Sequence, residues 1–108
     1  MVIADQPDMV VTVLADDPKS PVIALAGELD LASVERTRAG IEPILDRKPA
    51  HVTFDLEKLT FMDSSGIALL VQVSNEIETV TLTRVPPIVH RVLEATGLLE
   101  HFGLAEHS

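Results

Sequence analysis

The sequence contains no cysteine, tryptophan or tyrosine, and its aromatic residues are three phenylalanines. Without cysteine the chain can form neither disulfides nor zinc–thiolate sites, and it offers no thiol nucleophile. Aromatic residues make up only 3% of the chain, so a platform on which nucleic-acid bases stack is not expected. These absences direct attention to hydroxyl and carboxylate side chains.

Basic residues are also scarce. Eight lysines and arginines stand against 17 aspartates and glutamates, which gives a net charge of −9. Binding to nucleic acid or to an anionic membrane depends on attraction to phosphates, so we expect neither partner. An acidic chain can attract a basic protein partner, although acidity that serves only solubility is the simpler interpretation.

Long apolar runs are missing, because no stretch approaches the roughly 20 residues that a membrane-spanning helix needs. Residues Met1 to Asp5 carry neither a basic segment nor the apolar core of a signal peptide. We therefore expect a cytoplasmic protein. The 108 residues, 46% of them apolar, suffice for one hydrophobic core, so residues 1–108 are expected to form a single domain.

Hydrophobic periodicity predicts an α/β fold. Strands are expected at residues 9–15, 22–26, 51–56 and 77–83, and helices at about 31–45, 65–74 and 86–96. The first two strands can pair as a hairpin, whereas the strand–helix–strand order that follows predicts a parallel pair with a right-handed crossover. We expect a small mixed sheet of about four to five strands covered by three to four helices. Residues 1–7 show no pattern and are expected to be frayed.

The first and last helices carry specific predictions. Asp30 is the favoured N-cap of the first helix, with Ser33 as the competitor. Pro43 lacks an N–H and clashes with the preceding turn, so a kink or restart is expected between Gly40 and Pro43. Gly97 is the expected C-terminal cap of the last helix. The apolar residues at helical spacing, which should face the core, are Leu31, Val34, Ile41 and Leu45 in the first helix and Ile88, Val89, Val92 and Leu93 in the last.

One turn, Phe61-Met62-Asp63-Ser64-Ser65-Gly66, places two hydroxyls and a carboxylate where a strand ends and a helix begins. The first amides of a helix have no intrahelical partner, and the helix dipole favours negative charge there. A serine at this point can cap the helix, bind an anion through the amides, or be modified. From the residues alone, helix capping is the favoured interpretation for Ser64, Ser65, Asp63 and Asp30.

An enzyme or a metal site has little support. A nucleophile elbow has glycine two residues before its serine, whereas Met62 occupies that position before Ser64. Neither a known metal motif nor a glycine-rich phosphate loop occurs, and Asp55 is interpreted as a strand-end polar residue. We therefore expect no catalytic residue, no metal and no cofactor. The histidines are scattered along the chain at His51, His90, His101 and His107.

Several motifs together resemble the STAS domain family, the fold of bacterial anti-sigma factor antagonists. They are Gly27-Glu28-Leu29-Asp30, Phe54-Asp55-Leu56, the segment from Leu59 to Gly66, and the segments Val85 to Val89 and Thr96 to Leu98. The resemblance covers about residues 9–104. Two features depart from the family pattern. Residues 72–81 lack the glycine-rich turn that usually follows the second helix and look several residues short, and a proline within the first helix is unusual.

The resemblance implies a phosphorylation switch. In this family a kinase-type anti-sigma factor phosphorylates the serine directly after the aspartate, which here is Ser64. The unphosphorylated antagonist binds the anti-sigma factor and frees the sigma factor, and a phosphatase resets it. Asp30, Asp63, Ser65 and Gly66 would form the surrounding switch surface. The alternative is a STAS scaffold or sensor module in another signalling assembly, binding a protein or a small anionic ligand. The sequence leaves the oligomeric state open.

Overall fold

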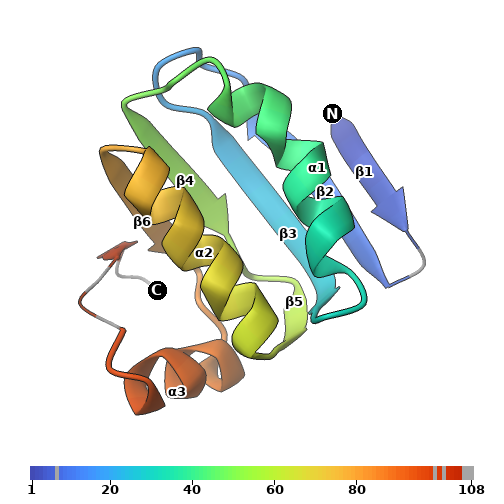
Figure 1. Cartoon of the computed structure of the whole chain (residues 1–108), viewed down its shortest axis with the longest axis vertical. Coiled ribbons are helices and arrows are strands. Elements are labelled where there is room, and N and C mark those ends of the chain that lie inside the picture. The colour runs from blue at the N-terminus through green and yellow to red at the C-terminus, as the bar shows by residue number, and fades with distance from the viewer. Residues whose placement is uncertain (7, 99, 101, 106–108) are drawn as a thin grey trace.

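Seven strands form one mixed sheet in the computed structural model, which describes residues 1–6, 8–98, 100 and 102–105 (Figure 1). The strand order is β1-β2-β3-β4-β6-β7, and β5 pairs with β3. The strands are β1 Val2–Gln6, β2 Met9–Ala15, β3 Val22–Leu29, β4 His51–Asp55, β5 Leu59–Met62, β6 Thr79–Thr83 and β7 Gly103–Ala105. The helices are α1 Val34–Leu45, α2 Ser64–Glu76 and α3 Pro87–Ala95.

Strand β3 is the longest strand, and its neighbours position the polar turns. On one side it pairs antiparallel with β2, which pairs antiparallel with β1. On the other side its first half pairs parallel with β4, and its last residues pair parallel with β5, with Leu29 opposite Met62. Strands β4, β6 and β7 continue the sheet in parallel. The carboxyl ends of β3 and β5 therefore meet at one edge of the sheet.

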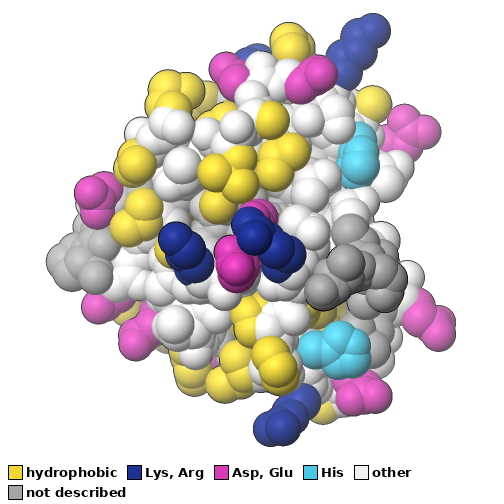
Figure 2. All heavy atoms as spheres, turned by 180° about the vertical axis from the view of Figure 1, so that it is seen from behind, with side chains coloured by type: hydrophobic (Ala, Val, Ile, Leu, Met, Phe, Trp, Pro, Cys, Tyr) yellow, Lys and Arg dark blue, Asp and Glu magenta, His cyan; other side chains and the backbone are white. Residues whose placement is uncertain are grey.

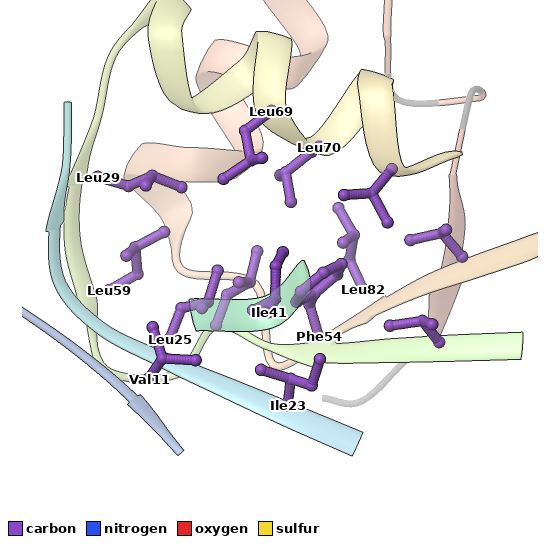
Figure 3. Close-up of a cluster of buried hydrophobic side chains, with 14 of the residues drawn as sticks. Val11, Ile23, Leu25, Leu29, Ile41, Phe54, Leu59, Leu69, Leu70 and Leu82 are labelled. Atoms are coloured by element: carbon purple, nitrogen blue, oxygen red, sulfur yellow. The ribbon is translucent and has the colours of Figure 1, made fainter. Parts of the chain in front are cut away.

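The hydrophobic core lies between the sheet and the layer formed by α1 and α2 (Figures 1 and 3). Alternating residues of the strands point into it, because side chains of a strand alternate between the two faces. In the strands predicted at residues 51–56 and 77–83, Phe54 and Leu82 are completely buried and Val80 is 4% exposed. The α/β class and the mixed sheet are thus confirmed.

Three short strands were not predicted. Residues 2–6 form the edge strand β1 instead of a frayed end, and Pro7 lies outside the described residues. Strands β5 and β7 have four and three residues. Such segments are too short to show a period, and their backbone hydrogen bonds to a neighbouring strand define them. Phe102, just before β7, is 5% exposed and packs on the core.

Helix α1 begins later than predicted and continues through Pro43. Residues 31–33 form a turn, so Leu31 is 75% exposed and does not face the core. The predicted restart near Pro43 is wrong, because the helix runs unbroken to Leu45. Pro43 lies so close to the helix end that few backbone bonds are affected. Ile41 and Leu45 are buried as predicted, and Val34 packs partly buried against the core.

The segment after α2 is short because the helix is long. Helix α2 extends to Glu76, and only Ile77 and Glu78 separate it from β6. Ile77 is extended and buried, and its amide still bonds to the Val73 carbonyl, so no glycine is needed to leave the helix.

In α3, Val89 and Leu93 are completely buried as predicted, but Ile88 is 45% exposed and lies outside the core stripe. Gly97, with φ +74°, ends this helix as expected. The amides of Gly97 and Leu98 donate to the carbonyls of Glu94 and Leu93, the two bonds of a Schellman motif.

Candidate functional site

Asp63 caps helix α2 and connects it to strand β3. Its backbone is extended, and its Oδ1 accepts hydrogen bonds from the amides of Ser65 at 2.8 Å and Gly66 at 3.4 Å. Its other oxygen, Oδ2, accepts from the Leu31 amide at 3.3 Å. The capping role of Asp63 is therefore confirmed. Ser65 does not cap the helix, because it is already the second helical residue and donates its own amide to Asp63.

Asp30 holds the turn that leads into α1. Its Oδ1 accepts from the amides of Ala32 at 3.0 Å and Ser33 at 3.1 Å. Ser33 takes the N-cap position without a side-chain cap bond, and its Oγ instead donates to the Glu28 carbonyl at 2.7 Å. Asp30 thus fixes the turn before the helix rather than the first helical turn itself, which corrects the predicted N-cap.

The parallel pairing of β3 and β5 brings these two turns together. The Asp63 amide donates to the Leu29 carbonyl at 3.2 Å, and Asp63 Oδ2 accepts from Leu31. One carboxylate therefore bonds to backbone on both sides of the junction. The two turns share one rigid backbone frame at the carboxyl edge of the sheet, although their aspartates are 33 residues apart in the chain.

Ser64 is the first residue of α2 and is exposed to solvent. Its hydroxyl makes no hydrogen bond within the described part of the chain, whereas the aspartate before it is fixed by three. The hydroxyl is therefore accessible from solvent without any unfolding of the helix. A group attached there would lie at the positive end of the α2 dipole, next to the Asp63 carboxylate.

Gly66 lets α2 approach the ends of β3 and β5 closely. A Cβ atom at this position would lie 2.8 Å from Met62 Cγ, 2.9 Å from Leu29 Cγ and 3.0 Å from the Leu29 carbonyl oxygen. Real Cβ atoms essentially never lie closer than 3.0 Å to such neighbours. The glycine is thus required by packing at the point where the helix begins.

Two exposed apolar side chains near Asp63 are absent from the sequence-based site. Leu31 is 75% exposed, and Phe61, two residues before Asp63, is 42% exposed. Periodicity placed Leu31 in the core because it assumed an earlier helix start. Neighbouring side chains of a strand point to opposite faces, so the burial of Met62 implies that Phe61 points to solvent. Large apolar side chains in solvent beside an ordered polar turn are typical of a surface that binds a protein.

A groove between α1 and α2 opens beside Ser65. Its volume is about 340 Å³, and its lining residues are Val34, Glu35, Arg38, Ser65, Ala68, Leu69 and Gln72. Arg38 crosses from α1 to α2, where it pairs with Glu76 at 2.8 Å and bonds to Gln72 at 3.4 Å. The groove therefore extends from Ser65, next to Ser64, along the surface between α1 and α2.

Asp55 stands at the end of β4 as predicted, and it takes part in an ion pair that the sequence did not reveal. Arg84, at the end of β6, binds Asp55 and also pairs with Glu57 at 3.0 Å. Burial by itself raises the pKa of Asp55, but the hydrogen bond and charge of Arg84 and the amide of Glu57 outweigh it. The net result is a pKa below the ordinary aspartate value.

Catalytic and metal-binding arrangements are not evident around Ser64. His51 lies at the amino end of β4, where its Nε2 is 2.8 Å from Thr81 Oγ1, whereas Ser64 follows the carboxyl end of the parallel strand β5. His101 and His107 lie outside the described residues. Across the ranges that the structure describes, no group of three or more histidine, aspartate or glutamate side chains could hold a metal ion. No helix there is long and apolar enough to cross a membrane.

Comparison with known proteins gives a consistent result. A family model described as "STAS domain" matches residues 10–108. An anti-sigma F factor antagonist from Lysinibacillus sphaericus is 38% identical over 82 residues, which cover 71% of this chain and 70% of that protein.

Two solved structures of SpoIIAA are also similar. The anti-sigma factor antagonist SpoIIAA in its unphosphorylated form has a TM-score of 0.73 and 29% identity, over 92% of this chain and 89% of that one. The Bacillus cell fate determinant SpoIIAA in the phosphorylated form has a TM-score of 0.66 and 28% identity, over 92% of each chain.

Proposed function

This chain belongs to the STAS domain family, and we propose that it is an anti-sigma factor antagonist controlled by phosphorylation of Ser64. In this proposal the unphosphorylated protein binds a kinase-type anti-sigma factor and thereby frees a sigma factor. Phosphorylation of Ser64 by that partner releases the antagonist, and a phosphatase restores it. The protein itself catalyses nothing.

The observation that carries the proposal is the state of Ser64. Its hydroxyl is exposed and free of hydrogen bonds in the described part of the chain, while Asp63 holds the surrounding backbone with three hydrogen bonds. A modification there can change the surface without loss of an internal contact. The structures of SpoIIAA in phosphorylated and unphosphorylated forms support this view by analogy.

The electrostatics favour release rather than unfolding. A phosphoserine adds about −1.5 to −2 charges at neutral pH. At the N-terminus of α2 this charge is favourable to the helix dipole, although the adjacent Asp63 carboxylate opposes it. The fold should therefore tolerate the modification. A partner that contacts this surface would have to desolvate the new charge or meet it with its own charges, and binding is weakened.

The contact surface would comprise the polar turn and the apolar side chains beside it. Asp30, Asp63, Ser65 and Gly66 belong to the ordered turns, and Leu31 and Phe61 add exposed apolar area. An interface core of this kind, apolar side chains next to a small set of fixed polar groups, is typical of protein partners. The phosphate would stand between these features.

A small anionic ligand at the same helix end is the weaker alternative. Such a ligand would use the free amides of the first helical turn. The amides of Ser65 and Gly66 already donate to the Asp63 carboxylate. An anion would have to displace this carboxylate or bind beside it against repulsion.

Phosphorylation in vitro tests the proposal. The protein is incubated with labelled ATP and the kinase-type anti-sigma factors of the same organism, alongside Ser64→Ala and the matched control Ser65→Ala. We expect one of these kinases to label the wild type and Ser65→Ala but not Ser64→Ala. Label that persists on Ser64→Ala would assign the modification elsewhere, and absence of label with every kinase would contradict the proposal.

A further inference from the structure

The carboxylate of Asp63 occupies the amides to which a phosphate at the start of α2 would otherwise bind. The first amides of a helix have no intrahelical partner, and an anion at a helix N-terminus accepts their hydrogen bonds. In α2 the amides of Ser65 and Gly66 donate to Asp63 Oδ1 at 2.8 Å and 3.4 Å. The Ile67 amide donates to the Asp63 carbonyl at 3.1 Å. A phosphate on Ser64 therefore finds these amides already used.

The Asp63 carboxylate is also held from its other side, which opposes its displacement. Its Oδ2 accepts from the Leu31 amide at 3.3 Å, and the backbone amide of Asp63 donates to the Leu29 carbonyl at 3.2 Å. A phosphate that replaced the carboxylate would exchange one anion for another at the helix amides. The exchange would break the bond to Leu31, which joins the two turns, so it brings no net gain in hydrogen bonds.

Arg38 is the basic residue that lines the groove beside Ser65, and it is engaged farther along α2. Its guanidinium donates to Gln72 at 3.4 Å and to Glu76 at 2.8 Å. Gln72 is eight residues after Ser64, which corresponds to about 12 Å along the helix at 1.5 Å per residue. Arg38 is therefore held away from the position where a phosphate on Ser64 would lie.

Three further basic residues lie on other faces of the domain. Arg36 stands between Val34 and Arg38, which both line the groove. Because successive residues of a helix are about 100° apart, Arg36 points to the far side of α1. Lys58 and Arg84 line a hollow on the face of the sheet opposite α1 and α2, and Figure 2 shows basic side chains next to acidic ones in the middle of that face. These cations are therefore directed away from the start of α2.

We propose that Asp63 is a positioning residue of the switch: by filling the amides at the start of α2, it keeps a phosphate on Ser64 in solvent, where a partner meets its full charge. This inference rests on the proposed phosphorylation of Ser64. A phosphate bound to the helix amides would be partly neutralised and drawn onto the domain, and it would repel a partner less. With the amides filled, a partner that covers this turn has to desolvate the whole charge.

NMR spectroscopy of protein that carries phosphoserine installed at position 64 during translation tests the inference without a kinase. In the wild type the amide signals of Ser65 and Gly66 should not follow the ionisation of the phosphate, and the second pKa of the phosphate should not fall below its ordinary value of about 6. In Asp63→Ala both amides are free to bind the phosphate. Their signals should then shift downfield as the phosphate ionises, and its pKa should be lower than in the wild type by about 0.5. Phosphorylation should also raise the melting temperature of Asp63→Ala by about 2 to 4 °C and leave that of the wild type nearly unchanged.

Asp63→Asn is the matched control, because asparagine removes the same charge and still caps a helix through its side-chain oxygen. Its Ser65 and Gly66 signals should stay insensitive to the phosphate, as in the wild type. Equal responses in Asp63→Asn and Asp63→Ala would show that charge alone acts and would overturn the proposal. So would a wild type whose Ser65 and Gly66 amides already follow the phosphate, or an Asp63→Ala protein whose amides do not. None of these results depends on whether a kinase labels Ser64, so a failure of this inference is distinguished from a failure of the proposed function.

Discussion

Gly66 is the position where one methyl group tests how tightly α2 is packed against the strand ends. In Gly66→Ala the new Cβ would meet Met62 Cγ at 2.8 Å and the Leu29 carbonyl oxygen at 3.0 Å. The methionine can move, but the carbonyl belongs to β3 and accepts the Asp63 amide, so its displacement disturbs the cap of α2. Adding a methyl group to a filled site of this kind costs about 1 to 3 kcal/mol.

Helix propensity opposes this cost, because alanine is favoured over glycine within a helix by about 1 kcal/mol. Subtracting this gain leaves a net cost of up to about 2 kcal/mol, and because the backbone carbonyl of Leu29 cannot move freely, we expect Gly66→Ala to be less stable than the wild type. For a chain of this length each kcal/mol corresponds to about 4 °C, so the melting temperature should fall by up to about 8 °C. Differential scanning calorimetry measures this difference.

Gly40→Ala is the matched control for Gly66→Ala. Gly40 also lies within a helix, but it lines a cavity together with Pro43 and Met1 instead of facing the ends of β3 and β5, so we expect less crowding of a methyl group there. Only the propensity should act there, and the melting temperature should stay the same or rise. A Gly66→Ala protein as stable as the wild type, or more stable, would refute the argument that close approach requires the glycine.

Two further predictions concern the carboxylates. Asp63→Ala should lower the free energy of unfolding by about 1 to 2 kcal/mol, as expected for loss of an N-cap, and Asp63→Asn should lower it less; urea denaturation measures both, and equal losses would contradict the capping argument. The pKa of Asp55 is lowered in the folded protein, so the stabilisation from its pairing with Arg84 is present at neutral pH and is lost as the pH falls below about 4. At neutral pH, thermal melts should therefore show a lower melting temperature for Arg84→Met than for the wild type. This difference in melting temperature should become smaller in acid, and a difference that does not change with pH would exclude the ion pair as the cause of the lost stability.

Much of the fold could be predicted because it rests on local patterns. The strands predicted at residues 51–56 and 77–83 contain β4 and β6, and the helix predicted at about 86–96 with Gly97 as its cap contains α3. Strands β1, β5 and β7 could not be predicted, because they are defined by the partner strand and not by their own residues. The exposed position of Leu31 was missed for a related reason. The turn held by Asp30 delays the start of α1, and the hydrogen bond from the Leu31 amide in this turn to Asp63 is a tertiary contact that no local pattern shows.

The candidate site was predictable as a list of residues but not as a geometry. The Asp63-Ser64-Ser65-Gly66 motif indicated where α2 begins, but it did not decide which of these side chains caps the helix. That choice depends on the backbone angles at the junction. The bond from the Leu31 amide to Asp63 joins residues 32 apart, and no local pattern reports it. The roles of Ser64 and its neighbours in binding a partner remain predictions.

The central claim is that a charge on Ser64 alters binding without altering the fold. The most direct test compares the affinity of the cognate anti-sigma factor for the unphosphorylated protein and for the same protein phosphorylated at Ser64, with the melting temperature of each. We predict an affinity at least tenfold lower after phosphorylation, a difference of about 1.4 kcal/mol or more, with a nearly unchanged melting temperature. Equal affinities, or a phosphorylated protein that unfolds, would contradict the account.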